Sequence, residues 1–157
     1  MTQTSQPLYP ITLFFDGSCQ LCSSEIRNLK LRDTEGRLAF IDCSAPGFTG
    51  GPAPRAALMD AIHSVDASGH VHVGVQTFRL AYAAVGMSWV SRVLDWPLVG
   101  PWAERAYPVL VRNRYRLPRW LVSGLFERAA QRAEQAEQRS RACHGGACAI
   151  NHDEGER

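Results

Sequence analysis

Apolar and polar residues alternate in stretches that divide the first half of the chain into short strands and helices. Residues 11–15 form an apolar run rich in strand-favouring side chains, which predicts a buried central strand. Residues 38–43 predict a second strand, and between the two Cys22, Ile26 and Leu29 recur at helical spacing. A strand, a helix and a second strand make a βαβ unit, for which we expect parallel pairing.

The next segments predict a short helix, a hairpin and another helix. Residues 55–60 favour a short helix after a loop rich in glycine and proline. Residues 62–66 and 70–73 flank a turn, a pattern typical of a β-hairpin. Residues 75–85 favour a helix with apolar side chains on one face. The predicted order is therefore β-α-β-α-β-β-α.

The remainder of the sequence is predicted to be helical. Helices are expected at 89–94, from about 101 to 115, and from about 118 into an alanine-, glutamine- and arginine-rich stretch that ends near 141. That last stretch has almost no apolar residues beyond alanine, which predicts an exposed extension. We divide the chain into a domain over residues 9–121 and an extension with a mobile tail over residues 122–157.

Aromatic and basic residues gather in the helical region. Four tryptophans fall on apolar helical faces, where we expect them in the core: Trp89, Trp96, Trp102 and Trp120. Four arginines cluster between positions 112 and 119. Such a patch could contact nucleic acid or anionic lipid. We favour a solvated helix end whose arginine stems cover apolar surface, and expect no nucleic-acid partner.

Composition narrows the class of protein. The chain has 157 residues and a net charge of +2, which fits one globular domain with a sizeable core. A long apolar run and a secretory leader are not visible, so we expect a cytoplasmic protein. In a reducing compartment, two cysteines separated by two residues are more often catalytic or metal-binding than structural.

Such a cysteine pair stands directly after the first predicted strand, in the segment Asp16-Gly17-Ser18-Cys19-Gln20-Leu21-Cys22. Cys19 would lie at a helix N-terminus, which favours the thiolate, and Cys22 would follow one turn later, close enough to form a disulfide. We expect Cys19 to attack as an exposed thiolate and Cys22 to resolve the mixed disulfide, with no cofactor beyond this redox pair. With this dithiol, the element order predicts an α/β fold, a thioredoxin-like βαβ-αββα core with an appended C-terminal helical region.

The residues around the cysteines have expected roles. Gly17 allows a positive φ or a close backbone approach in the turn. Asp16 could transfer a proton for the second cysteine or hydrogen-bond the backbone of the turn, and we favour the second role. The remaining three set access and polarity at the dithiol: Ser18, Gln20 and Leu21.

Other cysteines and histidines leave alternatives open. Cys43 ends the second strand, where a buried core thiol is expected. The tail carries four more candidates: Cys143, His144, Cys148 and His152. They could form a zinc site or a second redox pair, although an unremarkable tail is the favoured interpretation.

The motif Asp16-Gly17-x-Cys19-x-x-Cys22 resembles the signature of the DCC family of thiol–disulfide oxidoreductases. The resemblance extends to Phe40-Ile41-Asp42, to the hairpin from Asp66 to Gly74, to Phe78, and to Arg112-Asn113-Arg114-Tyr115, so that it covers residues 12–121. It implies a thioredoxin-like fold and a protein or small-molecule thiol or disulfide substrate. Several members are fused to or stand beside membrane domains, which implies a membrane-associated partner.

The sequence departs from thioredoxins at one element. Those proteins place a cis-proline opposite the dithiol, whereas no proline occurs here between Arg55 and Trp96. We expect another backbone group near residues 61–62 in its place, which concerns substrate docking.

We therefore predict a thiol–disulfide oxidoreductase, for which the sequence names no electron donor. Two alternatives stay open. One is a zinc or iron module that uses Cys19 and Cys22 with the cysteines and histidines of the tail. The other is a non-catalytic interaction domain that docks on a membrane-associated partner through the tryptophans and arginines.

Overall fold

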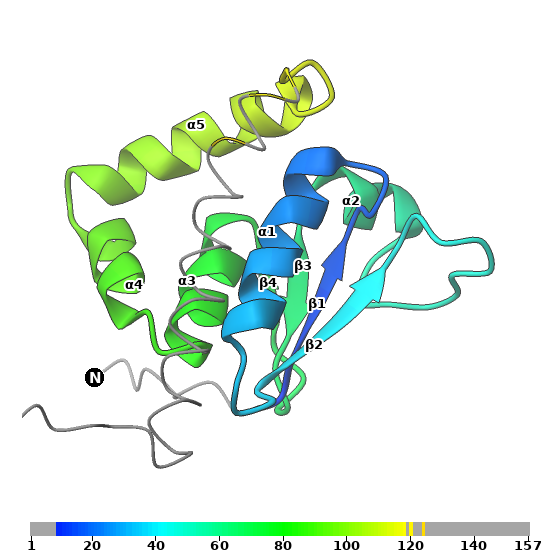
Figure 1. The fold of residues 1–157 in the computed structure, drawn as a ribbon, viewed down its shortest axis with the longest axis horizontal. Helices are drawn as coiled ribbons and strands as arrows, with labels where there is room; N and C mark the ends of the chain where they lie inside the picture. The colour runs from blue at the N-terminus through cyan, green and yellow to red at the C-terminus, as the bar shows by residue number, and fades with distance from the viewer. Residues whose placement is uncertain (1–8, 119, 121–123, 125–157) are drawn as a thin grey trace, which may run out of the picture.

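A computed structural model describes residues 9–118, 120 and 124 of the chain (Figure 1). The elements follow in the order β1 (Ile11–Phe15), α1 (Gln20–Arg32), β2 (Leu38–Asp42), α2 (Arg55–Asp60), β3 (His63–Val65), β4 (Val71–Val73), α3 (Val75–Ala84), α4 (Ser88–Asp95) and α5 (Val99–Asn113). This order confirms the predicted α/β fold with a thioredoxin-like βαβ-αββα core and further helices behind it. Most of the predicted extension and the whole tail lie outside the described residues.

Four strands form one mixed sheet in the order β2-β1-β3-β4. β1 pairs in parallel with β2, so that Phe15 lies opposite Asp42, and it pairs antiparallel with β3. β3 and β4 form the predicted hairpin. The apolar run of β1 is explained by its central place, because strands on both sides and layers on both faces bury it.

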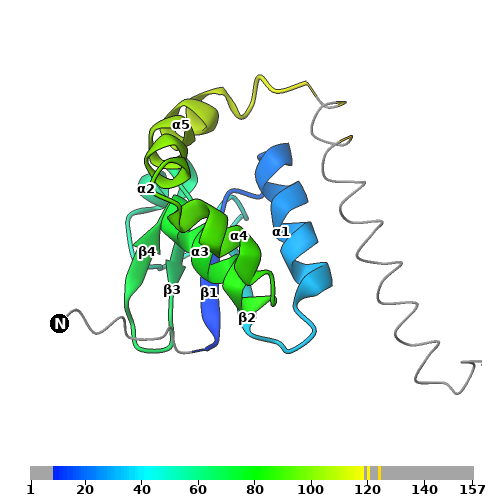
Figure 2. The same ribbon diagram turned by 90° about the vertical axis from the view of Figure 1, so that its left-hand side faces the viewer.

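Alternate side chains of β1 face two different layers. Ile11, Leu13 and Phe15 pack with residues of α1 and α3, and Phe14 packs on the other face with Cys43 and Leu58 of α2. Figure 2 shows α1 and α3 together on one side of the sheet. The expectation that Cys43 is a buried core thiol is confirmed, since its exposed fraction is zero.

The expectation that the tryptophans belong to the core is wrong. Trp89, Trp96, Trp102 and Trp120 are between 57% and 73% exposed. α4 packs on α3 through partly buried positions and contains no fully buried residue, and in α5 only Gly100 is buried. The helices therefore contact the core through narrow stripes, and within the described part of the chain no further layer covers their aromatic side chains.

α5 positions residues of the site. It crosses the end of the sheet at which β1 ends and α1 begins (Figures 1 and 2). Its C-terminal end carries Arg114 and Tyr115 to Asp16, 98 and 99 positions away in sequence. The appended helical region thus completes the surroundings of the predicted dithiol.

Candidate active site

The dithiol lies where β1 passes into α1, as the sequence predicts. Cys19 is the N-cap residue of α1, and its sulfur accepts a hydrogen bond from the backbone N–H of Cys22 at 3.3 Å. The Cys22 thiol donates to the same sulfur, with the two Sγ atoms 2.9 Å apart. Cys19 therefore receives donors from the first helical turn, where unpaired N–H groups favour negative charge.

These contacts give the two thiols opposite acidities. The pKa of Cys19 is lowered to about 6, mainly by the hydrogen bond from the Cys22 thiol. The Cys22 N–H and the positive charge of Arg114 act in the same direction, and burial opposes them. The pKa of Cys22 is raised, because its proton is held by Cys19 and because burial and the negative Cys19 sulfur disfavour a second thiolate. The reduced pair thus carries its thiolate on Cys19 and its proton on Cys22.

The expected exposure of the Cys19 thiolate is wrong. Cys19 has an exposed fraction of zero, whereas Cys22 is only partly buried and lines a cavity. The cause is the capping geometry, because the Cys19 side chain folds back over the helix end to accept the Cys22 N–H. Cys19 is therefore the more acidic thiol, and Cys22 is the more accessible one.

Asp16 is buried, with 3% of its surface exposed, and both of its carboxylate oxygens accept hydrogen bonds. Oδ1 accepts from the backbone N–H of Ser18 at 2.9 Å and from its hydroxyl at 2.6 Å. Oδ2 accepts from Arg114 Nη2 at 3.1 Å and from the Tyr115 hydroxyl. The contacts to Ser18 fit the expected role of Asp16 in holding the turn.

Arg114 corrects the expectation of a solvated arginine cluster, because only 8% of its surface is exposed. Its guanidinium donates to Asp16 and to the backbone carbonyls of Met59 and Asp60, so that it joins β1, α2 and the end of α5. Sequence reasoning missed this role, and also that of Tyr115. The available signal was a carboxylate beside the cysteines, which when buried requires a partner of opposite charge.

A glycine is required at position 17 by the close approach of the Asp42 side chain and not by a positive φ. Its N–H donates to Asp42 Oδ1 at 2.9 Å, and a Cβ at this position would lie 2.1 Å from Asp42 Oδ2. Its φ is not among the positive values found at other glycines. Burial raises the pKa of Asp42, but hydrogen bonds from Ser44 and Gly17 outweigh it and leave that pKa lowered. Gly17 therefore ties the turn before Cys19 to the end of β2.

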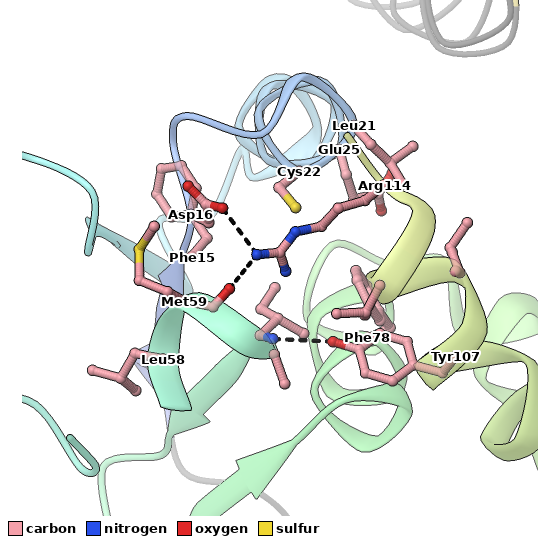
Figure 3. A pocket seen from close by; sticks show the side chains of 14 residues that line it. Phe15, Asp16, Leu21, Cys22, Glu25, Leu58, Met59, Phe78, Tyr107 and Arg114 are labelled. Carbon is pink, nitrogen blue, oxygen red and sulfur yellow. Dashed lines mark hydrogen bonds and ion pairs between the residues drawn. The ribbon is translucent and has the colours of Figure 1, made fainter. Parts of the chain in front are cut away.

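A cavity of about 140 Å³ lies beside Cys22 (Figure 3). Its walls come from the start of α1, the end of β1, α2, α3 and α5, and they are mainly apolar. Of the residues predicted to set access, Leu21 lines this cavity, Ser18 bonds Asp16, and Gln20 is exposed. The cavity brings Cys22 together with Arg114, Asp16 and Glu25.

The segment before β3 faces the same cavity, where the sequence predicts a backbone group in place of a cis-proline. Ala61 and Ile62 line the cavity, and Ala61 is extended. The Tyr107 hydroxyl accepts a hydrogen bond from the Ile62 N–H at 3.0 Å. His63 Nδ1 lies 2.9 Å from the Ala61 carbonyl oxygen. The backbone of this segment is therefore bonded to its own domain.

Glu25 is a buried carboxyl that the sequence analysis did not single out. It follows Cys22 by one turn of α1, lines the cavity and accepts a hydrogen bond from the Tyr82 hydroxyl. Burial raises its pKa above the usual 4.5, although the Tyr82 hydroxyl and the charge of Arg32 oppose this. A buried carboxyl on the helix that carries the dithiol could have been suspected only from its helical spacing relative to Cys22.

We expect Glu25 to make the protein less stable as pH rises. Because its pKa is raised in the folded state, the folded protein binds this proton more tightly than the unfolded chain does. The resulting stabilisation is fully present below about 4.5 and is lost as pH rises through the folded pKa. Urea unfolding at a series of pH values measures the effect. As pH rises, the free energy of unfolding of the wild type should fall relative to that of Glu25→Gln, so that the variant becomes the more stable protein. Glu104→Gln, at an exposed position of α5, should follow the wild-type curve.

The alternative of a metal site concerns the cysteine, histidine and acidic side chains. Within residues 9–118, 120 and 124, no group of three or more cysteine, histidine, aspartate or glutamate side chains could hold a metal ion. The tail candidates lie outside the described residues: Cys143, His144, Cys148 and His152. Among the described helices, none is long and apolar enough to cross a membrane.

Comparison with known proteins adds a family to this geometry. The DCC1-like thiol-disulfide oxidoreductase family matches residues 13–120, which contain the dithiol, the cavity and the Arg114–Asp16 pair. The Arabidopsis thaliana protein named "Uncharacterized protein At5g50100, chloroplastic" is 30% identical over 115 residues, which are 69% of this chain and 53% of that protein. The chain thus spans about half the length of this relative. No solved structure matches the chain. On the extent of the family match, the chain belongs to the DCC1-like thiol-disulfide oxidoreductase family.

Proposed function

We propose that the protein catalyses thiol–disulfide exchange, with Cys19 and Cys22 as its redox pair. The observation that carries this proposal is the placement of the two sulfurs 2.9 Å apart at the N-terminus of α1, where hydrogen bonds from Cys22 lower the pKa of Cys19. The family supports thiol or disulfide substrates in general. The chain spans about half the length of its Arabidopsis relative, so the identity of these substrates is itself a matter of proposal.

The exchange itself needs no bound group. In the oxidised protein, an external thiolate attacks one sulfur of the Cys19–Cys22 disulfide and forms a mixed disulfide, and the other sulfur leaves as a thiolate. A second external thiolate then attacks the mixed disulfide, releases an external disulfide and leaves the protein dithiol. Two electrons pass from two external thiols to the protein, and the reverse sequence reduces an external disulfide.

Cys19 supplies the stabilised thiolate in this scheme. A sulfur with a low pKa leaves faster, and stabilising the reduced form makes a dithiol pair more oxidising. Asp16 acts as a positioning residue, because it holds Ser18 beside Cys19 and anchors Arg114. The charge of Arg114 lowers the pKa of Cys19, whereas the charge of Asp16 itself raises it. The geometry therefore favours oxidation of external thiols over reduction of external disulfides.

A redox titration in glutathione buffers tests the proposal. Alkylation followed by mass spectrometry should assign a reversible two-electron transition to Cys19 and Cys22. If the pair stays unlinked in every buffer, the proposed function is wrong.

The low pKa of Cys19 should depend on the Cys22 side chain. In Cys22→Ala the main hydrogen bond to Cys19 is lost, so we expect the Cys19 pKa to rise from about 6 toward its ordinary value. Cys22→Ser retains a donor and should keep most of the lowering. The ultraviolet absorbance of the thiolate, followed against pH, measures ionisation without requiring a reagent to reach the buried sulfur. Equal pKa values in both variants would contradict the assignment.

The exposed tryptophans favour a second function for the helical region, that of a docking surface for a partner protein. Trp89 lies in α4, Trp96 is the C-cap of α4, and Trp102 lies on α5, all largely exposed. Aromatic residues are enriched in protein interfaces. Binding of a partner that survives Cys19→Ser/Cys22→Ser and is lost in Trp96→Ala/Trp102→Ala would establish this function, and it would be independent of the redox chemistry.

A further inference from the structure

We propose that the external sulfur exchanged at this dithiol belongs to a small, neutral, mostly apolar thiol or disulfide that enters the cavity beside Cys22 and reacts at Cys22 Sγ. This inference rests on the proposed function and adds the substrate class and the point of entry. It reverses the order expected from the sequence, in which Cys19 meets the substrate first.

Access points to Cys22. Exchange requires the incoming sulfur to touch the sulfur that it attacks. Cys19 has no exposed surface, whereas Cys22 is partly exposed and lines the cavity. Figure 3 shows the Cys22 sulfur directed toward the space between Arg114 and the apolar side chains. A ligand in the cavity therefore meets Cys22, with Cys19 directly behind it at 2.9 Å.

The size and lining of the cavity define the group that it holds. At about 140 Å³ the cavity is close to the roughly 150 Å³ of an engineered apolar cavity that holds benzene, so one aromatic ring or a short alkyl chain fits. Transfer of a charged group into such surroundings is unfavourable. Apolar lining side chains come from β1, α1, α2, the residue before β3, α3 and α5, and include Phe15, Leu21, Leu58, Ile62, Phe78 and Val111.

One polar atom in the cavity wall, Arg114 Nε, can donate a hydrogen bond to a ligand. Arg114 lines the cavity and is buried, and its Nε has no hydrogen-bond partner among the described residues. Its two Nη atoms are already engaged, and its charge is matched by Asp16. Because buried polar groups are normally hydrogen-bonded, this N–H favours a ligand with one acceptor and no net charge.

The same region is poorly suited to an extended peptide. A peptide that adds to a strand uses free backbone N–H and C=O groups. Here the carbonyls of Met59 and Asp60 accept from Arg114, and that of Ala61 lies against the His63 ring nitrogen. The Ile62 N–H donates to Tyr107, and the Ile62 carbonyl accepts from the backbone of Gly74. The segment therefore offers little for a polypeptide to pair with.

The exchange is balanced in both directions. In the oxidised protein the neutral ligand thiol enters the cavity and gives up its proton to solvent as its sulfur attacks Cys22 Sγ; the bond to Cys19 breaks, and Cys19 leaves as the thiolate. The sulfur of a second neutral ligand thiol attacks the ligand sulfur of the mixed disulfide, and Cys22 leaves and takes up the proton of that thiol. In reverse, the proton of Cys22 passes to Cys19, and Cys22 attacks the external disulfide and releases one ligand thiolate. That thiolate takes the proton from Cys19, and Cys19 then displaces the second ligand thiolate from Cys22, which takes up a proton from solvent.

Two aromatic disulfides test the inference on the reduced full-length protein. Dithiodipyridine is neutral and carries a ring nitrogen that can accept a hydrogen bond, and dithiobis-nitrobenzoate carries two negative charges. Each oxidation rate is divided by the rate of the same probe with a free cysteine derivative. We expect the neutral probe to react about tenfold faster or more on this scale, a ratio typical of differences in fit to an apolar pocket.

Matched substitutions locate the effect. Val111→Phe fills the cavity from α5 and should lower the rate with the neutral probe about tenfold. Val109→Phe makes the same change at an exposed position of the same helix and should leave it unchanged. Ala61→Leu fills the cavity from the opposite wall, so the test survives if one variant fails to fold. In Cys19→Ser, mass spectrometry should find the pyridylthio group on Cys22, and Cys22→Ser should form an adduct more slowly.

The outcomes separate the two proposals. Equal normalised rates for both probes, or rates that Val111→Phe and Ala61→Leu do not change, would overturn the cavity inference and leave the exchange function in place. Faster adduct formation at Cys19 than at Cys22 would overturn the point of entry. Failure of both probes and of glutathione to link Cys19 and Cys22 would overturn the proposed function itself.

Discussion

Replacing Arg114 with alanine is expected to lower the free energy of unfolding by about 3–5 kcal/mol, the range found when one partner of a buried ion pair is removed. The side chains of Arg114 and Asp16 are 8% and 2% exposed, so the carboxylate would remain buried without its counter-charge. The carbonyls of Met59 and Asp60 would also lose their donor. Urea unfolding of the reduced protein at neutral pH measures the loss.

Two further variants make this result specific. Arg116→Ala removes an exposed arginine two positions later and should change the stability by less than about 0.5 kcal/mol. Asp16→Asn/Arg114→Met removes both charges together and should recover much of the loss, because no unpaired charge then remains buried. If Arg114→Ala lowers the free energy of unfolding no more than Arg116→Ala does, the ion pair does not stabilise the fold.

A methyl group at Gly17 is expected to destabilise the protein by about 3 kcal/mol, since it combines overpacking with the loss of charge-assisted hydrogen bonds. The added Cβ would meet the three carboxylate atoms of Asp42 at 2.1, 2.4 and 2.6 Å. That carboxylate is held by the N–H groups of Gly17 and Ser44 and by the Ser44 hydroxyl, so it cannot move without breaking these contacts. Thermal and urea unfolding of Gly17→Ala test the expectation.

The control for this substitution is Gly124→Ala, where an added Cβ has nothing within 4 Å. It should not lower the free energy of unfolding, because alanine is favoured over glycine in a helix. In Gly17→Ala/Asp42→Ala the obstructing carboxylate is gone, so the double variant should lose less stability than the sum of the losses in the two single variants. Additive losses would mean that the Cβ and the carboxylate do not meet.

The fold was predictable because its signals are local. The apolar run of β1, the helical spacing after Cys19 and the turn between β3 and β4 each specify their element within a few residues, and their order then defines the sheet. The helix start at Cys19 was predictable for the same reason. The capping sulfur, however, turned inward, and the exposure of a capping side chain depends on packing that the pattern does not describe.

The missed features depend on contacts between distant parts of the chain. Arg114 sits in a run of arginines that looks solvated, and only the position of α5 above Asp16 buries it. A periodic pattern predicts that the tryptophans lie in the core, but such a pattern does not say whether a second layer covers the apolar face. Glu25 and Tyr82 lie 57 positions apart and meet only because α1 and α3 share one side of the sheet.

The closure of Arg114 onto Asp16 also has a consequence for synthesis of the chain. A ribosome makes the cysteines early and must add almost a hundred further residues before the arginine appears. Until then a nascent βαβ segment can cap its helix with Cys19, but it lacks the distant cation and the α5 wall of the cavity. The hydrogen bond from Cys22, the largest cause of the low Cys19 pKa, is local, whereas the charge of Arg114 and the α5 wall of the cavity reach the thiols only when the helical region has been released and has folded back.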